Sequence, residues 1–199
     1  MKTNIGVFFG GRSTEHEISV ISANQAINAI DKSKYDVTPV YVSKEGLWFT
    51  GDALLNLRNY RDMKAIEKMA EEVYMRPVHG DCNLYYQKPK GMFGKKEIAA
   101  KLDVVIPVFH GANGEDGTFQ GILQAIDIPF AGCDTLSSAN GMDKITMKMI
   151  LRENDIPVVD YVWFTDRQWL ADRDNLVSRI EEKIGYPVIV KPANLGSSI

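Results

Sequence analysis

The stretch of residues 104–117 constrains the fold more than any other part of the chain. Its first half, VVIPVF, is a continuous apolar run, which is typical of a strand buried on both faces of a parallel sheet. Its second half, HGANGEDG, changes at once to a histidine, three glycines and two acidic residues. Ligands of open α/β sheets bind outside the carboxyl ends of the strands, so this loop is a candidate binding site.

Apolar runs alternate with segments of helical periodicity along residues 1–133. Strands are expected over residues 5–9, 36–42 and 128–132, and a hairpin over residues 73–87. Helices are expected after the first strand and after Gly117, where apolar residues recur at helical spacing. This alternation predicts the α/β class, with a parallel, doubly wound sheet in an N-terminal domain of residues 1–133.

The starts of these two helices carry sequence signals. Thr14 and Glu17 form a capping-box pattern, which predicts that the first helix begins there. Asp116 is placed to cap the second helix, and together with Glu115 it is expected to orient the neighbouring loop. The side chains expected to face the sheet are Val20, Ala23, Ile27 and Ile30 in the first helix and Phe119, Ile122, Leu123 and Ile126 in the second.

Residues 134–199 indicate a second domain. A helix is expected over residues 143–154, another around Leu176 and Ile180, and strands over residues 158–164 and 188–190. The sequence stops one loop past the last of these strands, although so apolar a strand needs cover on both faces. We therefore expect the second domain to be truncated and the chain to be a fragment that is inactive by itself.

Composition and charge exclude several classes of function. The 199 residues carry a net charge of −3, which gives no reason to expect a nucleic acid or a membrane as a partner. No apolar run approaches the ~20 residues of a membrane span, and residues 1–4 lead into the first expected strand without the apolar segment of a signal peptide, so none is expected. Cys82 and Cys133 form no CxxC motif, so reduced thiols and a cytoplasmic location are expected.

Two common nucleotide-binding motifs do not match. Gly10 and Gly11 follow the first strand, but the segment is not G-x-G-x-x-G, and no acidic residue ends the second strand. The GKK segment at residues 94–96 lacks the hydroxyl residue and the earlier glycine of a Walker A motif. The sequence therefore argues against a nicotinamide cofactor and against a P-loop.

Three residues of the first domain are candidates for binding a substrate. Glu15 lies in the first helical turn, where a carboxylate either complements the helix dipole or holds a substrate ammonium, and its position alone leaves both open. His110 is either a satisfied loop histidine or a donor to a carboxylate or a developing oxyanion. Glycines such as Gly111 favour the donor, because they let a ligand approach the backbone.

Candidates for binding phosphate lie in the second domain. Lys191 directly follows an apolar run and precedes a Gly-Ser-Ser loop, so it is a plausible phosphate clamp. Lys144 taken alone is a solvated helix lysine more often than a ligand. Ser197 and Ser198 belong either to the same phosphate loop or to a flexible linker, and their spacing does not decide between these.

Five segments in this order resemble the N-terminal half of the D-alanine–D-alanine ligase family, a member of the ATP-grasp superfamily. They are GGRSTEHEIS at residues 10–19, HGANGEDG at 110–117, GCD at 132–134, MDK at 142–144 and KPANLGSS at 191–198. Together they extend over essentially the whole chain. The insertion that precedes residue 104 resembles the branch that also contains D-alanine–D-lactate and D-alanine–D-serine ligases.

The resemblance implies that residues 134–199 are the first part of an ATP-grasp domain. It implies ATP-dependent ligation of two D-alanine molecules through D-alanyl phosphate, for peptidoglycan precursors, with Mg²⁺ ligands expected beyond residue 199. It also implies a homodimer formed through the N-terminal domain. The implied catalytic residues are Glu15, His110 and Ser197; Glu15, His110 and Gly111 would bind D-alanine, and Lys144, Lys191, Ser197 and Ser198 would hold ATP.

Other functions fit parts of the same pattern. The second substrate of a ligase of this branch can be D-alanine, D-lactate or D-serine, and another ATP-grasp carboxylate–amine ligase is the nearest rival. A non-catalytic binding module of the same fold would keep ligand binding without releasing phosphate. A structural or interaction role for the chain as given is the third alternative.

Overall fold

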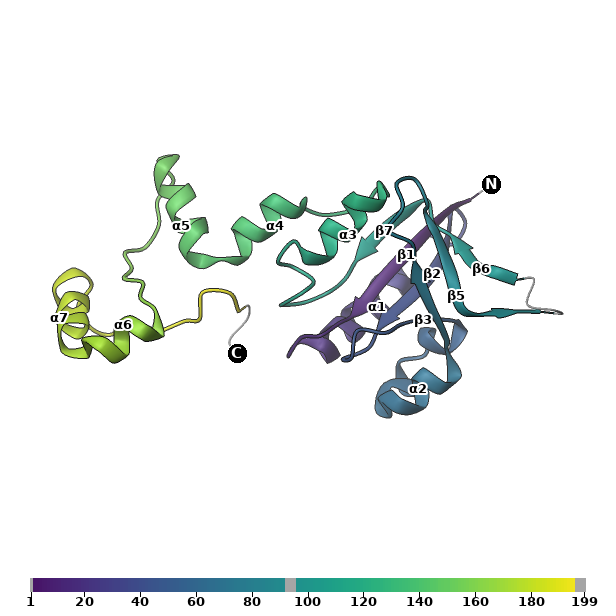
Figure 1. Cartoon of the computed structure of the whole chain (residues 1–199), viewed down its shortest axis with the longest axis horizontal. Coiled ribbons are helices and arrows are strands. Elements are labelled where there is room, and N and C mark those ends of the chain that lie inside the picture. The colour runs from purple at the N-terminus through teal and green to yellow at the C-terminus, as the bar shows by residue number, and fades with distance from the viewer. Residues whose placement is uncertain (1, 92–95, 196–199) are drawn as a thin grey trace. The chain divides into compact units, whose positions relative to one another are not determined.

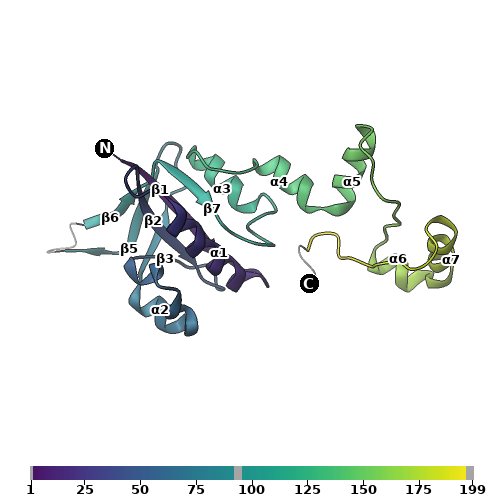
Figure 2. The ribbon, with the colours of Figure 1, turned by 180° about the vertical axis from the view of Figure 1, so that it is seen from behind.

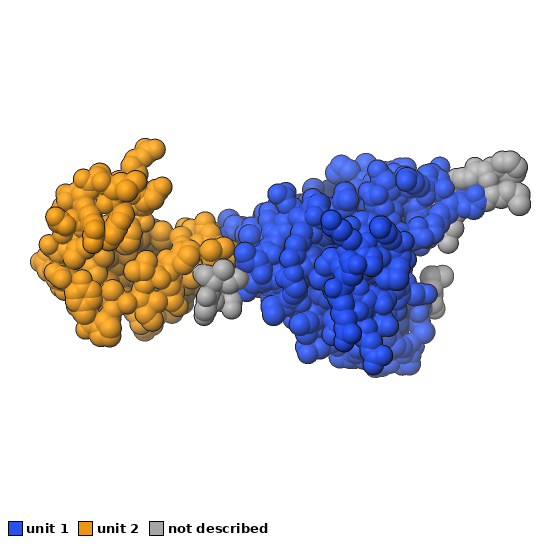
Figure 3. All heavy atoms as spheres, turned by 90° about the horizontal axis from the view of Figure 1, so that it is seen from below, with its two compact units in different colours: residues 1–139, 196–199 blue, residues 140–195 orange. Residues whose placement is uncertain are grey.

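The computed structural model describes residues 2–91 and 96–195 (Figure 1). It divides into two compact units, which Figure 3 distinguishes by colour. Unit 1 contains the described residues up to Ala139, and unit 2 is Asn140–Leu195. The domain boundary expected after residue 133 stays a prediction. Within the described ranges, no helix is both long enough and apolar enough to cross a lipid bilayer.

One seven-stranded sheet in the order β6-β5-β4-β3-β2-β1-β7 forms the centre of unit 1. Strand β1, next to the edge strand β7, pairs in parallel with β2 and with β7, and Ile5 lies opposite Val104. Each pairing from β2 outward to β6 is antiparallel. The strands are β1 (Thr3–Gly10), β2 (Tyr35–Val42), β3 (Trp48–Thr50), β4 (Glu71–Met75), β5 (Asn83–Lys90), β6 (Lys96–Lys101) and β7 (Val104–Pro107).

The sheet is therefore mixed, and its parallel part is limited to β2, β1 and β7. The turns from β2 to β3 and from β4 to β5 are too short for the crossover that parallel neighbours require, so these strands form antiparallel hairpins. The hairpin expected over residues 73–87 is confirmed by β4 and β5. The strand expected over residues 128–132 is reduced to one parallel bridge between Phe130 and Val105.

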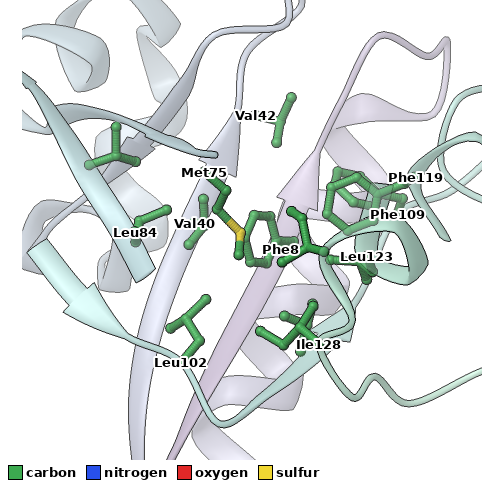
Figure 4. Close-up of a cluster of buried hydrophobic side chains, with 13 residues drawn as sticks. Phe8, Val40, Val42, Met75, Leu84, Leu102, Phe109, Phe119, Leu123 and Ile128 are labelled. Carbon is green, nitrogen blue, oxygen red and sulfur yellow. The ribbon is translucent and has the colours of Figure 1, made fainter. Parts of the chain in front are cut away.

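Two helices cover opposite faces of the parallel strands. Alternate residues of β1 point to the two faces, so Val7 packs with α1 (His16–Ala29) and Phe8 packs with α3 (Thr118–Ile126). Figure 2 shows α1 lying across the sheet, and Figure 4 shows Phe8 among the side chains of the other face. The α1 face is also covered by η1 (Asp52–Leu55), η2 (Leu57–Arg61) and α2 (Met63–Met69).

Both helix starts differ in detail from the sequence signals. The N-cap of α3 is Gly117 and not Asp116, although the Asp116 carboxylate accepts from the Thr118 amide. Helix α1 begins after Glu15 with no side-chain cap, so the capping box expected from Thr14 and Glu17 does not form. Glu17 instead pairs with Lys44 on the exposed side of the helix. Of the residues expected to face the sheet, Ile122 is 40% exposed, because the sheet-facing stripe of the short helix α3 is filled by its neighbours.

Unit 2 contains the last residues of α4 (Thr135–Met142) and three further helices, α5 (Lys144–Glu153), α6 (Asp166–Ala171) and α7 (Arg173–Lys183). The strands expected over residues 158–164 and 188–190 do not form. Ile189 and Val190 are 82% and 76% exposed. A strand needs a neighbouring strand for its backbone hydrogen bonds, and the described part of unit 2 contains none.

Candidate functional site

The loops that follow β1 and β7 lie side by side at the carboxyl edge of the sheet. Since these strands are parallel neighbours, the two loops leave the sheet in the same direction. The loops also contact each other, because the side-chain amide of Asn113 donates to the carbonyl oxygen of Arg12 over 3.2 Å. The structure thus brings together the loops that carry Glu15 and His110, as expected for a site at strand ends.

A buried histidine fixes the first loop. His16 is fully buried, with its Nδ1 2.7 Å from the carbonyl oxygen of Gly11 and its Nε2 3.1 Å from the Tyr41 hydroxyl. Nδ1 must therefore donate to this carbonyl, and in a neutral ring Nε2 then accepts from Tyr41. Burial raises the pKa of Tyr41, so this phenol stays a donor. The two hydrogen bonds of His16 also fix the start of α1, next to Glu15.

Two serines of α1 connect this helix to the ends of both strands. Ser19 is buried; its hydroxyl accepts from the Gly10 amide over 2.8 Å and donates to the Val108 carbonyl oxygen over 2.5 Å. Ser22 lies one turn further along the same helix face, and its Oγ is 3.0 Å from Nε2 of His110. The sequence analysis missed both serines; their signal is a polar residue beside the sheet-facing positions Val20 and Ala23.

Glu15 lies close to Gly111, the residue that follows His110. Gly111 has a φ of 77°, and a Cβ added to it would lie 2.6 Å from Oε2 of Glu15. The carboxylate therefore rests against this glycine. Among the described residues, none donates a hydrogen bond to the Glu15 carboxylate and none bonds to Nδ1 of His110, and both side chains are half-buried. The Glu15 carboxylate and Nδ1 of His110 thus remain available to a ligand.

The two acidic residues of the second loop stabilise the loop itself. A carboxylate oxygen of Glu115 accepts from the Gly111 amide over 2.6 Å. Asp116 accepts from the amides of Asn113 and Thr118, the latter being the first residue of α3. Burial alone would raise the pKa of Asp116, but these hydrogen bonds outweigh it and hold the pKa below its ordinary value. Both residues therefore orient the loop, as expected.

In unit 2, Lys144 contacts the segment that follows Lys191. The amide of Lys144 donates to the Ala193 carbonyl over 3.1 Å, and its ammonium donates to the carbonyls of Ala193 and Leu195. Lys191 is exposed, and none of the described residues forms an ion pair or hydrogen bond with its side chain. The structure brings these two motifs together, while Ser197 and Ser198 lie outside the described residues.

Lys144 and Lys191 each provide an ammonium group, which is a donor of the kind that anionic oxygens accept from. Across residues 2–91 and 96–195, His, Cys, Asp and Glu side chains form no group of three that could hold a metal ion. A separate cleft of 680 Å³ in unit 2 is lined by Arg152, Tyr161 and Arg179 among others, but not by Lys144 or Lys191.

Known protein families match most of the sequence. The family described as D-ala D-ala ligase N-terminus matches residues 4–133, and D-ala D-ala ligase C-terminus matches residues 150–199. The D-alanine–D-alanine ligase of Thermosipho melanesiensis is 44% identical over 98% of this chain and 51% of that protein. The ligase of Geobacillus thermodenitrificans is 38% identical over 100% of this chain and 53% of that protein. The chain thus spans about half the length of the curated relatives it matches.

Solved structures share the fold. The D-alanine-D-alanine ligase from Coxiella burnetii superposes with a TM-score of 0.84 at 31% identity, covering 99% of this chain and 55% of that one. The VanG D-Ala:D-Ser ligase from Enterococcus faecalis superposes with a TM-score of 0.78 at 33% identity, covering 100% of this chain and 54% of that one. This likeness confirms the predicted fold class, an N-terminal α/β domain followed by the first part of an ATP-grasp domain.

Proposed function

Because this chain belongs to the D-alanine–D-alanine ligase family, we propose that it provides the first D-alanine site and the phosphate-binding lysines for ATP-dependent ligation of two D-alanine molecules. One observation carries this proposal. The Glu15 carboxylate, which lies against Gly111, has no donor among the described residues, and Nδ1 of the preceding residue, His110, has no partner among them. A zwitterionic amino acid offers the complementary groups, an ammonium for Glu15 and a carboxylate for His110.

The chain's residues have separate tasks in this reaction. When bound, ATP supplies the phosphoryl group that converts the carboxylate of D-alanine into an acyl phosphate, which the amine of a second amino acid attacks with release of phosphate. Glu15 holds the ammonium of the first D-alanine and keeps it from reacting. His110 lies against the carboxyl group and stabilises negative charge there.

Lys144 and Lys191 hold the phosphates of ATP in this proposal. Their positive charges balance the charge that develops on the transferred group. We also assign Ser197 and Ser198 to ATP binding and Ser197 to catalysis. Mg²⁺ is the metal we propose, with its ligands in the part of the ligase that follows residue 199.

The wider role follows from the same family. We place the reaction in the synthesis of peptidoglycan precursors in the cytoplasm, with a homodimer formed through the N-terminal domain. The second candidate function is ligation of D-alanine to D-serine, because the VanG D-Ala:D-Ser ligase is among the similar solved structures. D-lactate is a third possible second substrate, and both alternatives use the same first D-alanine site.

Titrating the chain with D-alanine, followed by NMR, tests the first site. D-alanine is expected to shift the amide signals of residues 110–117 and of the start of α1. Glu15→Gln is expected to weaken binding by roughly 1.5–3 kcal/mol, since a charge-assisted hydrogen bond is lost. Glu17→Gln is the matched control, because Glu17 pairs with Lys44 on the exposed side of the same helix. If Glu15→Gln and Glu17→Gln bind D-alanine with equal affinity, Glu15 does not hold the ammonium and only complements the helix dipole.

The two lysines need a test of their own. In a protein that continues this chain to the length of its relatives, Lys144→Ala and Lys191→Ala are expected to raise the KM for ATP at unchanged affinity for D-alanine. Lys148→Ala is the control, because this lysine lies one turn away on α5, over the ring of Tyr161. A loss confined to D-alanine binding would overturn the assignment.

A further inference from the structure

Ser22 is the one described side chain that hydrogen-bonds to the ring of His110. Its Oγ lies 3.0 Å from Nε2 across a sequence separation of 88 residues. Both groups are half-buried, so water competes with the contact only in part. This pairing has no part in the tasks assigned above, which makes its purpose a separate question.

The scaffold fixes the distance between the serine and the ring. Ser19, one helical turn before Ser22, is bonded at the same time to Gly10 at the end of β1 and to Val108 beyond the end of β7. The Val108 amide donates in turn to the Phe8 carbonyl over 2.7 Å. His110 therefore leaves the sheet from a point that is held against α1. The contact between Ser22 and the His110 ring therefore follows from the way Ser19 attaches α1 to the ends of β1 and β7.

The direction of the hydrogen bond follows from the available acceptors. A serine hydroxyl in a helix commonly donates to the carbonyl four residues earlier, but here no such bond forms. Among the described residues, the imidazole is the one hydrogen-bond partner of this hydroxyl. A neutral imidazole that accepts at Nε2 carries its proton at Nδ1. We propose that Ser22 is a positioning residue, which donates to Nε2 of His110 and thereby fixes the tautomer with the proton on Nδ1.

The consequence for binding rests on the proposed function. A carboxylate only accepts hydrogen bonds, so a lone pair on Nδ1 would repel the carboxyl group of D-alanine, whereas Nδ1–H can donate to it. The ring would then be a donor before the substrate arrives. Without Ser22, part of the binding free energy would be spent on shifting the proton between the two nitrogens.

Long-range ¹⁵N–¹H correlation spectra of histidine-labelled chain at pH 8.5 test the tautomer directly. The chain has three histidines, and His79→Gln and His110→Gln variants assign their signals. We expect His110 to show the Nδ1–H pattern. In Ser22→Ala it should shift toward the Nε2–H form that free histidine prefers, and Ser22→Thr should restore it. His16, whose two nitrogens are both bonded inside unit 1, should be unchanged in all variants.

Affinity for D-alanine gives the second readout. Ser22→Ala is expected to weaken binding about threefold to tenfold and Ser22→Thr less than twofold. An Nε2–H pattern for His110 in the unaltered chain would overturn the proposal without any variant. If D-alanine binds and Ser22→Ala changes neither tautomer nor affinity, Ser22 has no positioning role while the proposed function stands. If the tautomer is as expected and D-alanine does not bind, the proposed function fails and the role of Ser22 in fixing the tautomer stands.

Discussion

Units 1 and 2 contain similar apolar runs but bury them to very different degrees. In unit 1 the strands place apolar side chains on both faces of a sheet, and helices cover each face. Among the described residues of unit 2, Leu176 is the one buried apolar side chain, whereas Leu170 is 83% exposed. The difference teaches that a β-branched, apolar run becomes a buried strand only where other strands lie beside it to share its hydrogen bonds.

The largest expected effect comes from removing one ring in the core of unit 1. Phe8 is fully buried, and its ring centroid lies 5.2 Å from those of Trp48 and Phe119. Phe8→Ala should lower the free energy of unfolding by about 3–5 kcal/mol, measured by urea denaturation with circular dichroism. Phe164→Ala is the matched change in unit 2, where the ring stacks on Trp169 and is half-buried, and it should cost far less. Equal losses of unfolding free energy in Phe8→Ala and Phe164→Ala would contradict the difference in burial between the two units.

A smaller effect is expected at two glycines that have the same backbone conformation but different surroundings. Gly111 and Gly185 have φ of 77° and 75°, but a Cβ would meet Glu15 at the first and nothing within 4 Å at the second. Both alanine variants should lose roughly 1–2 kcal/mol locally from left-handed strain. Only Gly111→Ala should also displace the Glu15 carboxylate and weaken D-alanine binding. An unaltered affinity in Gly111→Ala would mean that Glu15 does not contact the ligand.

The next prediction concerns pH. Because the folded pKa of Asp116 is depressed, its contribution to stability is present above the unfolded pKa and is lost as pH falls through the folded pKa. Asp116→Asn should therefore cost about 1 kcal/mol at pH 7 and little at pH 2 in the unfolding of unit 1. Asp143→Asn in unit 2, whose carboxylate accepts from the Thr146 amide, should leave that pH dependence unchanged. A pH-independent loss in Asp116→Asn would refute the linkage.

The smallest effect is expected at the surface of unit 2. Leu170→Ser should change the free energy of unfolding by less than about 0.5 kcal/mol, because the side chain is 83% exposed. Leu176→Ser, at 6% exposed, is the control and should reduce the helical signal of α7. Sedimentation measurements should accompany both variants. A loss above 2 kcal/mol in Leu170→Ser would show that this residue is covered in solution, and the contrast between the units would fail.

Two of the three parallel strands, β1 and β7, were predictable because each is a continuous apolar run. Residues 5–9 and 104–107 read as strands buried on both faces. Strand β1 has that environment, whereas β7 lies at the edge of the sheet and only its Val105 is fully buried. Residues 45–101 were less predictable, since β3 is only three residues long and its pairing depends on hairpin turns. Residues 158–164 and 188–190 have the same local pattern as β1, so only the missing neighbours distinguish them.

The site was predictable where a residue's place in the chain decides its role. Glu15 and His110 follow apolar strands, and strands that pair in parallel bring such positions to one edge. Ser22 and His16 were not predictable in the same way. Their roles depend on partners 88 and 25 residues away, and nothing local to a helical serine or a buried histidine identifies those partners.

The strand order also has a consequence for how the chain folds. Strands β2, β3, β4 and β5 each pair with their immediate successor, so each of these pairings closes a short loop and can form early. The pairing of β1 with β7 joins Ile5 to Val104 and closes a loop of about a hundred residues. That pairing brings the two site loops to one edge of the sheet, where Asn113 can reach Arg12. Ligand-binding competence should therefore be acquired at the slowest step of refolding, after most of the sheet has formed.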